Sequence, residues 1–132
     1  MYITGKCHCG NIKLEATAKS DKAIVCHCTD CQLFSGAPYR AVVVCEGEML
    51  EFTGTPAEYT KTADSGNKRI QGFCSNCGTQ LYATDPKRLI YNVRVGWLEQ
   101  RYELHPSKHM FAASSQAWIK DLEKAEWHSR GL

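Results

Sequence analysis

Seven of the eight cysteines lie in three clusters in which neighbouring cysteines are separated by only one or two residues. The clusters are Cys7–Cys9, Cys26–Cys31 and Cys74–Cys77, and they offer two, three and two thiols. Thiols at these spacings are typical zinc ligands, because two sulfurs can approach one ion to about 2.3 Å each. The seven thiols therefore fill one tetrahedral site of four ligands and leave an incomplete site of three.

The first and third clusters share one form, since Cys9 and Cys77 are each followed directly by a glycine. Glycine tolerates a positive φ, so the backbone amides can turn toward the sulfurs as they do in a zinc knuckle. We therefore predict a closed, structural zinc site on the four thiols of these clusters, from Cys7, Cys9, Cys74 and Cys77. Such a site joins segments about 65 residues apart and would constrain the unfolded chain.

The middle cluster supplies only three thiolates, from Cys26, Cys28 and Cys31. Three protein ligands with an open fourth position are the coordination pattern of a catalytic zinc. A sulfur-rich zinc is a weak Lewis acid toward water, but it suits holding a fourth sulfur as a thiolate. We therefore predict that these three cysteines are the catalytic residues and that the substrate is a thiol. A closed structural site remains an alternative, with a fourth ligand from His8, His27, Asp30, Cys45 or a residue that the sequence does not identify.

Other uses of the cysteines are less consistent with the sequence. No secretory signal or apolar run of about 18 residues is present, so we expect a cytoplasmic protein without a membrane span, where disulfides are disfavoured. No βαβ pattern surrounds Cys74–Cys77, which disfavours thioredoxin-like redox chemistry. Cys45 ends an apolar run and is expected to be a buried core residue. The net charge is +2 with scattered basic residues, which disfavours nucleic-acid binding.

Strand signals dominate the chain that must position these thiols. Apolar and polar residues alternate from Ile12 to Thr17, and further strands are expected at Tyr39–Cys45, Met49–Thr53, Glu58–Thr62, Lys68–Phe73, Gln80–Ala83, Leu89–Val95 and His109–Ala113. One helical turn is expected at Thr29–Phe34, and Gln116–Trp127 is expected to be an amphipathic helix or irregular tail that covers the core. The sequence thus predicts a mainly β, zinc-stabilised single domain of short antiparallel strands over residues 1–132.

The order of these motifs resembles the glutathione-dependent formaldehyde-activating enzymes and their centromere-protein-V relatives. The resemblance covers about residues 7–118. It rests on the three cysteine clusters together with Ser35–Pro38, Ser65–Gly66, Phe73–Thr79, Pro106–Phe111 and Trp118. The chain departs from the family pattern at Gly96–Glu99 and at its C-terminal end.

The resemblance implies a β-tent fold, shared with zinc-bearing Rab-GTPase chaperones, and two zinc sites. One would be structural on Cys7, Cys9, Cys74 and Cys77, and the other more labile on Cys26, Cys28 and Cys31. The activity it implies is that of a carbon–sulfur lyase that joins glutathione and formaldehyde into S-(hydroxymethyl)glutathione, and the reverse. Candidates by charge alone for holding the two carboxylates of glutathione are Arg40, Lys68, Arg69 and Arg94.

We therefore predict a zinc-dependent carbon–sulfur lyase that acts on an adduct of a small thiol, such as glutathione, with an aldehyde. The alternative is a non-catalytic zinc-binding domain that interacts with a protein partner. A third possibility is an enzyme with the same kind of site that acts on another thiol or electrophile.

Overall fold

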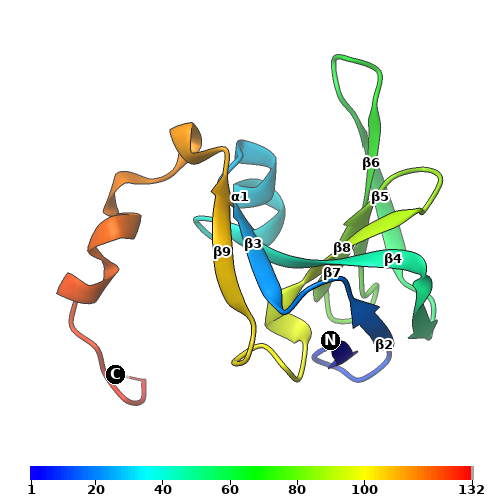
Figure 1. Ribbon diagram of the computed structural model, residues 1–132, viewed down its shortest axis with the longest axis horizontal. Helices are drawn as coiled ribbons and strands as arrows, with labels where there is room; N and C mark the ends of the chain where they lie inside the picture. The colour runs from blue at the N-terminus through cyan, green and yellow to red at the C-terminus, as the bar shows by residue number, and fades with distance from the viewer. Residues whose placement is uncertain (132) are drawn as a thin grey trace.

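The computed structural model describes residues 1–131, and its secondary structure is mainly β (Figure 1). The strands are β1 (Tyr2–Lys6), β2 (Lys13–Ala18), β3 (Lys22–Cys26), β4 (Arg40–Thr53), β5 (Ala57–Thr62), β6 (Lys68–Phe73), β7 (Gln80–Thr84), β8 (Ile90–Arg94) and β9 (His105–Met110). The helical segments are α1 (Thr29–Ser35) and the 3₁₀ segments η1 (Val95–Trp97), η2 (Ala112–Ser114) and η3 (Ala117–Lys124). The expected class, mainly β with little helix, is confirmed.

Strand β4 is the central strand of the sheet and pairs with three other strands along its 14 residues. Its first residues pair with β3, its middle pairs with β8 and its last residues pair with β2, all antiparallel. The sheet continues from β8 through β7 and β6 to β5. β4 thereby brings the ends of β3 and β8 to one place in the molecule.

The expectation of two separate strands, Tyr39–Cys45 and Met49–Thr53, was wrong, since β4 runs through both. Gly47 lies between the two expected strands, and a glycine at such a position often marks the end of a strand. In the structure its amide donates to the Leu89 carbonyl at 2.9 Å, and a Cβ at this position would collide with the Arg88 carbonyl oxygen. The glycine therefore allows a close approach of two backbones inside a continuous strand.

The core lies on the inward face of the sheet. Along β2 the residues Leu14, Ala16 and Ala18 are buried and the residues between them are exposed, as the alternating pattern predicts. Tyr82 from β7 packs against the rings of Phe52 and Tyr91 at centroid distances of 5.1 and 5.0 Å. Cys45 is fully buried in this cluster, which confirms its interpretation as a core residue.

The C-terminal part differs most from expectation. The last strand is β9, from His105 to Met110, and not His109–Ala113; it pairs parallel to β3. Pro106 is tolerated there because β9 pairs with β3 alone and lies at an edge. The segment after β9 does not cover the core: η3 has no buried residue, and the chain extends away from the sheet (Figure 1).

None of the helices within residues 1–131 is long and apolar enough to cross a membrane.

Candidate functional site

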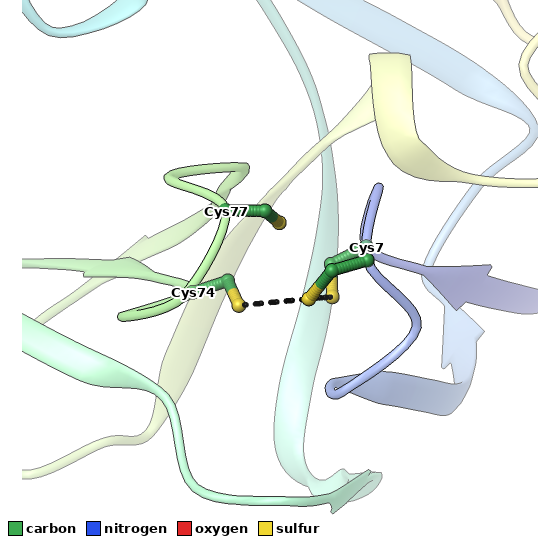
Figure 2. Close-up of side chains that lie close together, drawn as sticks. Cys7, Cys74 and Cys77 are labelled. Carbon is green, nitrogen blue, oxygen red and sulfur yellow. Dashed lines mark hydrogen bonds between the residues drawn. The ribbon is translucent and has the colours of Figure 1, made fainter.

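Four cysteines from two turns converge after β1 and after β6. The sulfurs of this four-cysteine cluster all lie within 4.8 Å of one another, and its members are Cys7, Cys9, Cys74 and Cys77. Figure 2 shows the side chains of Cys7, Cys74 and Cys77 directed toward a common centre from the two loops. The Sγ atoms of Cys7 and Cys9 are 3.7 Å apart, as are those of Cys9 and Cys74.

These distances fit a tetrahedral zinc. Sulfurs at about 2.3 Å from a central ion define a tetrahedron with edges of about 3.8 Å, whereas a disulfide needs about 2 Å between its sulfurs. All eight cysteines of the chain are free thiols. The chemistry and spacing of the donor set therefore match a Cys₄ zinc site better than any disulfide pairing.

Both turns have the conformation expected of zinc knuckles. Gly10 and Gly78 have φ angles of 84° and 78°, and their amides donate to the carbonyls of Cys7 and Cys74 at 2.9 Å. The Ile12 amide also lies 3.2 Å from the Cys7 sulfur and donates to it. The backbone thus offers N–H groups that offset the charge of a thiolate.

Local hydrogen bonds favour the thiolate form that a metal requires at Cys77 and Cys9. At Cys74 the backbone amide of Cys77 also favours the thiolate, but burial and the neighbouring sulfurs outweigh it and the pKa is raised. The pKa of Cys77 is lowered to about 5, chiefly because the Thr79 hydroxyl donates to its sulfur across 3.1 Å. The pKa of Cys9 is also lowered, first by a hydrogen bond from the Asn76 side chain and then by the Asn11 backbone. When a thiol ionises easily, protons compete less with a metal ion for its sulfur.

The remaining clustered thiols form a second group, the three-cysteine cluster, in which the sulfurs of Cys26, Cys28 and Cys31 lie within 4.8 Å of one another. Cys26 ends β3, Cys28 is the N-cap of α1, and Cys31 lies buried in the first turn of that helix. The Cys28 sulfur accepts the Cys31 amide at 3.3 Å, so the helix start fixes two of the three sulfurs relative to each other.

None of the four candidate fourth ligands joins this cluster within residues 1–131. Asp30 is engaged with Lys61, whose Nζ lies 2.6 and 2.7 Å from its two carboxylate oxygens. His27 is buried and its Nε2 lies 2.8 Å from Nδ1 of His109, while Cys45 lies in the core. His8 lines a neighbouring cleft instead. The described part of the chain therefore offers three ligands at this position and no fourth.

The thiols of the three-cysteine cluster differ in acidity. Burial opposes ionisation of Cys28, but the hydrogen bond from the Cys31 amide, the neighbouring sulfurs of Cys31 and Cys26 and the charge of Arg40 together outweigh it, so the net pKa is lowered. Burial raises the pKa of Cys31, and the neighbouring sulfurs of Cys26 and Cys28 raise it further. A divalent metal ion would remove this difference, because a coordinated thiol is deprotonated outright.

A cleft of about 790 Å³ lies beside both clusters. Gly78 and Thr79 of the four-cysteine knuckle line one part of it, and Ser35 and Tyr39, which follow the three-cysteine cluster, line another. Its basic and histidine side chains are Lys6, His8, Arg40, Arg94 and Arg101, and none of its lining residues is acidic. Of the four basic candidates from the sequence, Arg40 and Arg94 line the cleft, and Lys68 and Arg69 do not.

Sequence reasoning missed two parts of this site. The contact of His109 with His27 joins β9 to the three-cysteine cluster, although His109 stood out only as part of the motif Pro106–Phe111. Trp97 lines the cleft and donates through Nε1 to the Leu81 carbonyl at 3.0 Å. Neither contact has a local sequence signal, because both depend on strand pairing across the sheet.

Comparisons with known proteins agree with this geometry. A sequence model of the family described as glutathione-dependent formaldehyde-activating enzyme matches residues 2–114. No curated protein sequence matches the chain. A crystal structure of a Rhodobacter sphaeroides protein has the same fold, with a TM-score of 0.58 and 21% identity over 73% of this chain and 87% of that one.

Proposed function

Because this chain belongs to the family of glutathione-dependent formaldehyde-activating enzymes, we propose that it is a zinc-dependent carbon–sulfur lyase that acts on the adduct of a small thiol with an aldehyde. The proposed pair is glutathione and formaldehyde. The observation that carries the proposal is the three-cysteine cluster, which brings three sulfurs together and has no fourth protein ligand within residues 1–131.

Two zinc ions fit the donor sets of this chain in different ways. Cys7, Cys9, Cys74 and Cys77 would hold a structural ion with no open position, and the fold would depend on it. Cys26, Cys28 and Cys31 would hold the second ion and leave one position for a substrate. When bound there, zinc would supply a soft Lewis acid that keeps a substrate sulfur ionised at neutral pH.

The reaction needs no side-chain nucleophile and no further reactant. The substrate thiol gives up its proton, its sulfur forms a bond to the carbonyl carbon, and the carbonyl oxygen gains a proton. One thiol and one aldehyde thus become one S-hydroxymethyl thioether with every atom and electron retained. The task of the chain is to hold the two molecules in contact, which replaces a bimolecular encounter with a positioned one. The cleft beside the cluster has the volume to bind the remainder of a tripeptide thiol.

We propose that the enzyme works in the cytoplasm, since a reducing compartment preserves the free thiols on which both sites depend.

A non-catalytic role in binding a protein partner is the alternative. It is favoured by one feature, the exposed apolar side chains of the segment after β9, where Phe111 and Trp127 are 65% and 78% exposed. Such side chains are frequent in interaction surfaces. A binding domain would leave the exchange of formaldehyde with glutathione unchanged, so a single assay separates the two functions.

That assay is NMR exchange spectroscopy of glutathione, hydrated formaldehyde and their adduct, with and without the zinc-loaded protein. We expect the wild-type chain to accelerate the exchange and Cys28→Ala to abolish the acceleration while remaining folded. The serine analogue of glutathione, in which a hydroxyl replaces the thiol, should give no adduct. Equal acceleration by folded Cys28→Ala and wild type would contradict the proposal.

A further inference from the structure

Arg94, at the end of β8, is the only Lys, Arg, Asp or Glu that is buried among the described residues, with 6% of its surface exposed. No carboxylate within residues 1–131 forms an ion pair with it. Its Nη2 donates to the Gln71 side-chain oxygen at 2.7 Å, and its Nη1 donates to the Asn92 carbonyl at 3.3 Å. A buried guanidinium held by neutral acceptors alone is costly unless an anion compensates its charge.

A second guanidinium shares the same acceptor. Arg40 Nη1 donates to the oxygen of Gln71 at 3.1 Å, so one amide oxygen receives both arginines. Arg40 Nε is buried and has no hydrogen-bond partner. The Nε side of a guanidinium is one edge on which a carboxylate can accept two parallel hydrogen bonds. Burial, and then the charge of Arg40, lower the pKa of Arg94, and the nearby sulfurs of Cys31 and Cys26 offset this only in part.

The strand pairing explains why these groups meet beside the three-cysteine cluster. Arg40 at the start of β4 is the register partner of Cys26, and Arg94 is the partner of Val42 two residues along the same strand. Three thiolates with one divalent ion leave one negative charge, whereas the two guanidinium groups carry two positive charges. Before a substrate thiolate binds, the cluster therefore does not neutralise the pair, and the cleft that both arginines line has no acidic residue.

We infer that Arg40 and Arg94, fixed by Gln71, form a subsite for a carboxylate of the thiol substrate, an inference that rests on the proposed function. In glutathione the glycine carboxylate fits this subsite better than the glutamyl one. The glutamyl carboxylate carries a neighbouring ammonium group, which two guanidinium groups would repel, and the cleft offers no acid to compensate it. The substrate class is thus a thiol with a carboxylate that has no adjacent amine.

The test uses a ligand without sulfur, so that binding to the metal does not contribute. The probe is γ-glutamyl-2-aminobutyryl-glycine, which is glutathione with a methyl group in place of the thiol. Its partner is the same peptide with a C-terminal glycinamide. Isothermal titration calorimetry on the zinc-loaded protein should show that the amide binds about tenfold more weakly than the acid, as for loss of a charge-assisted hydrogen-bonded pair.

The arginine is tested by repeating both titrations on Arg40→Gln. The acid should lose its advantage, so that acid and amide bind within about twofold of each other. The matched control is Arg69→Gln, because Arg69 contributes to the field at Arg94 but does not line the cleft. This control should keep the tenfold preference for the acid. The comparison of acid and amide on wild-type protein needs no variant and stands even if Arg40→Gln fails to fold.

Equal binding of acid and amide to the wild-type protein, or no binding of either, would overturn the subsite. An unchanged preference for the acid over the amide in folded Arg40→Gln would also overturn it. Loss of that preference in Arg69→Gln would overturn it too, because it would show that the preference arises from the long-range electrostatic field of the basic residues. The proposed function fails separately. If the acid is preferred as described but exchange of formaldehyde is not accelerated, the carboxylate subsite stands and the lyase does not.

Discussion

Replacing Cys74 by serine should destabilise the fold by an amount that the chain topology sets. Cys9 and Cys74 lie 65 residues apart, and their sulfurs meet in the four-cysteine cluster. A link that closes a loop of this length lowers the entropy of the unfolded chain by an amount worth about 4 kcal/mol at 25 °C. That is a large part of the roughly 5–15 kcal/mol that stabilises a typical domain. We expect the midpoint of thermal unfolding to fall by about 10–20 °C.

The matched control is Cys28→Ser in the three-cysteine cluster. The loop that this cluster closes, Cys26–Cys31, is only a few residues long, so its closure constrains the unfolded chain far less. Serine also retains the N-cap of α1 that the Cys28 sulfur provides. Both variants are compared by thermal unfolding followed with circular dichroism, together with zinc content by mass spectrometry. Equal shifts in the two variants, or an unchanged midpoint and zinc content in Cys74→Ser, would refute the assignment of a structural ion to the four-cysteine cluster.

Three further outcomes follow from the same geometry. A mild chelator should remove the metal of the three-cysteine cluster first and leave the circular dichroism spectrum unchanged; release of both metals in one step with unfolding would contradict the distinction between the sites. The four-cysteine cluster has lowered pKa values at Cys77 and Cys9, a raised pKa at Cys74, and one more thiolate ligand than the three-cysteine cluster, so it should keep its metal to lower pH than that cluster. The three-cysteine cluster, in which burial raises the pKa of Cys31, should release its metal at higher pH, as a colorimetric zinc assay at stepped pH would show. Gly72→Ala should cost about 1–3 kcal/mol, since its Cβ would collide with the Tyr82 ring, whereas Gly96→Ala meets no atom within 4 Å and should unfold like wild type.

Local signals predicted those parts of the fold that local chemistry determines. Lys68–Phe73 forms a strand with the predicted bounds, and the helical turn at Thr29–Phe34 is present because the Cys28 sulfur caps it. The division of the seven clustered thiols into groups of four and three could also be predicted, because a glycine follows both Cys9 and Cys77. In the structure both glycines adopt a positive φ, and the sulfurs form these two groups.

Elements that depend on partners far along the chain were not predictable in this way. The strands β1 and β3 were not identified, and the bounds of β9 were wrong, since β9 is specified by its parallel pairing with β3. The residues that line the cleft likewise depend on how strands far apart in the sequence pair with each other. By charge alone, Arg69 and Arg94 were equal candidates for binding a carboxylate of glutathione. Only the pairing of β4 with β8 shows that Arg94 lines the cleft and Arg69 does not.

The central claim is that the three-cysteine cluster holds a metal with a position open to a substrate sulfur. Its most direct test is visible absorption of the protein with Co²⁺ in this cluster, titrated with glutathione and with the serine analogue. We predict that one equivalent of glutathione changes the sulfur-to-cobalt and ligand-field bands and that the hydroxyl analogue leaves them unchanged. A spectrum that already has the form of four sulfur ligands and does not respond to glutathione would contradict the account.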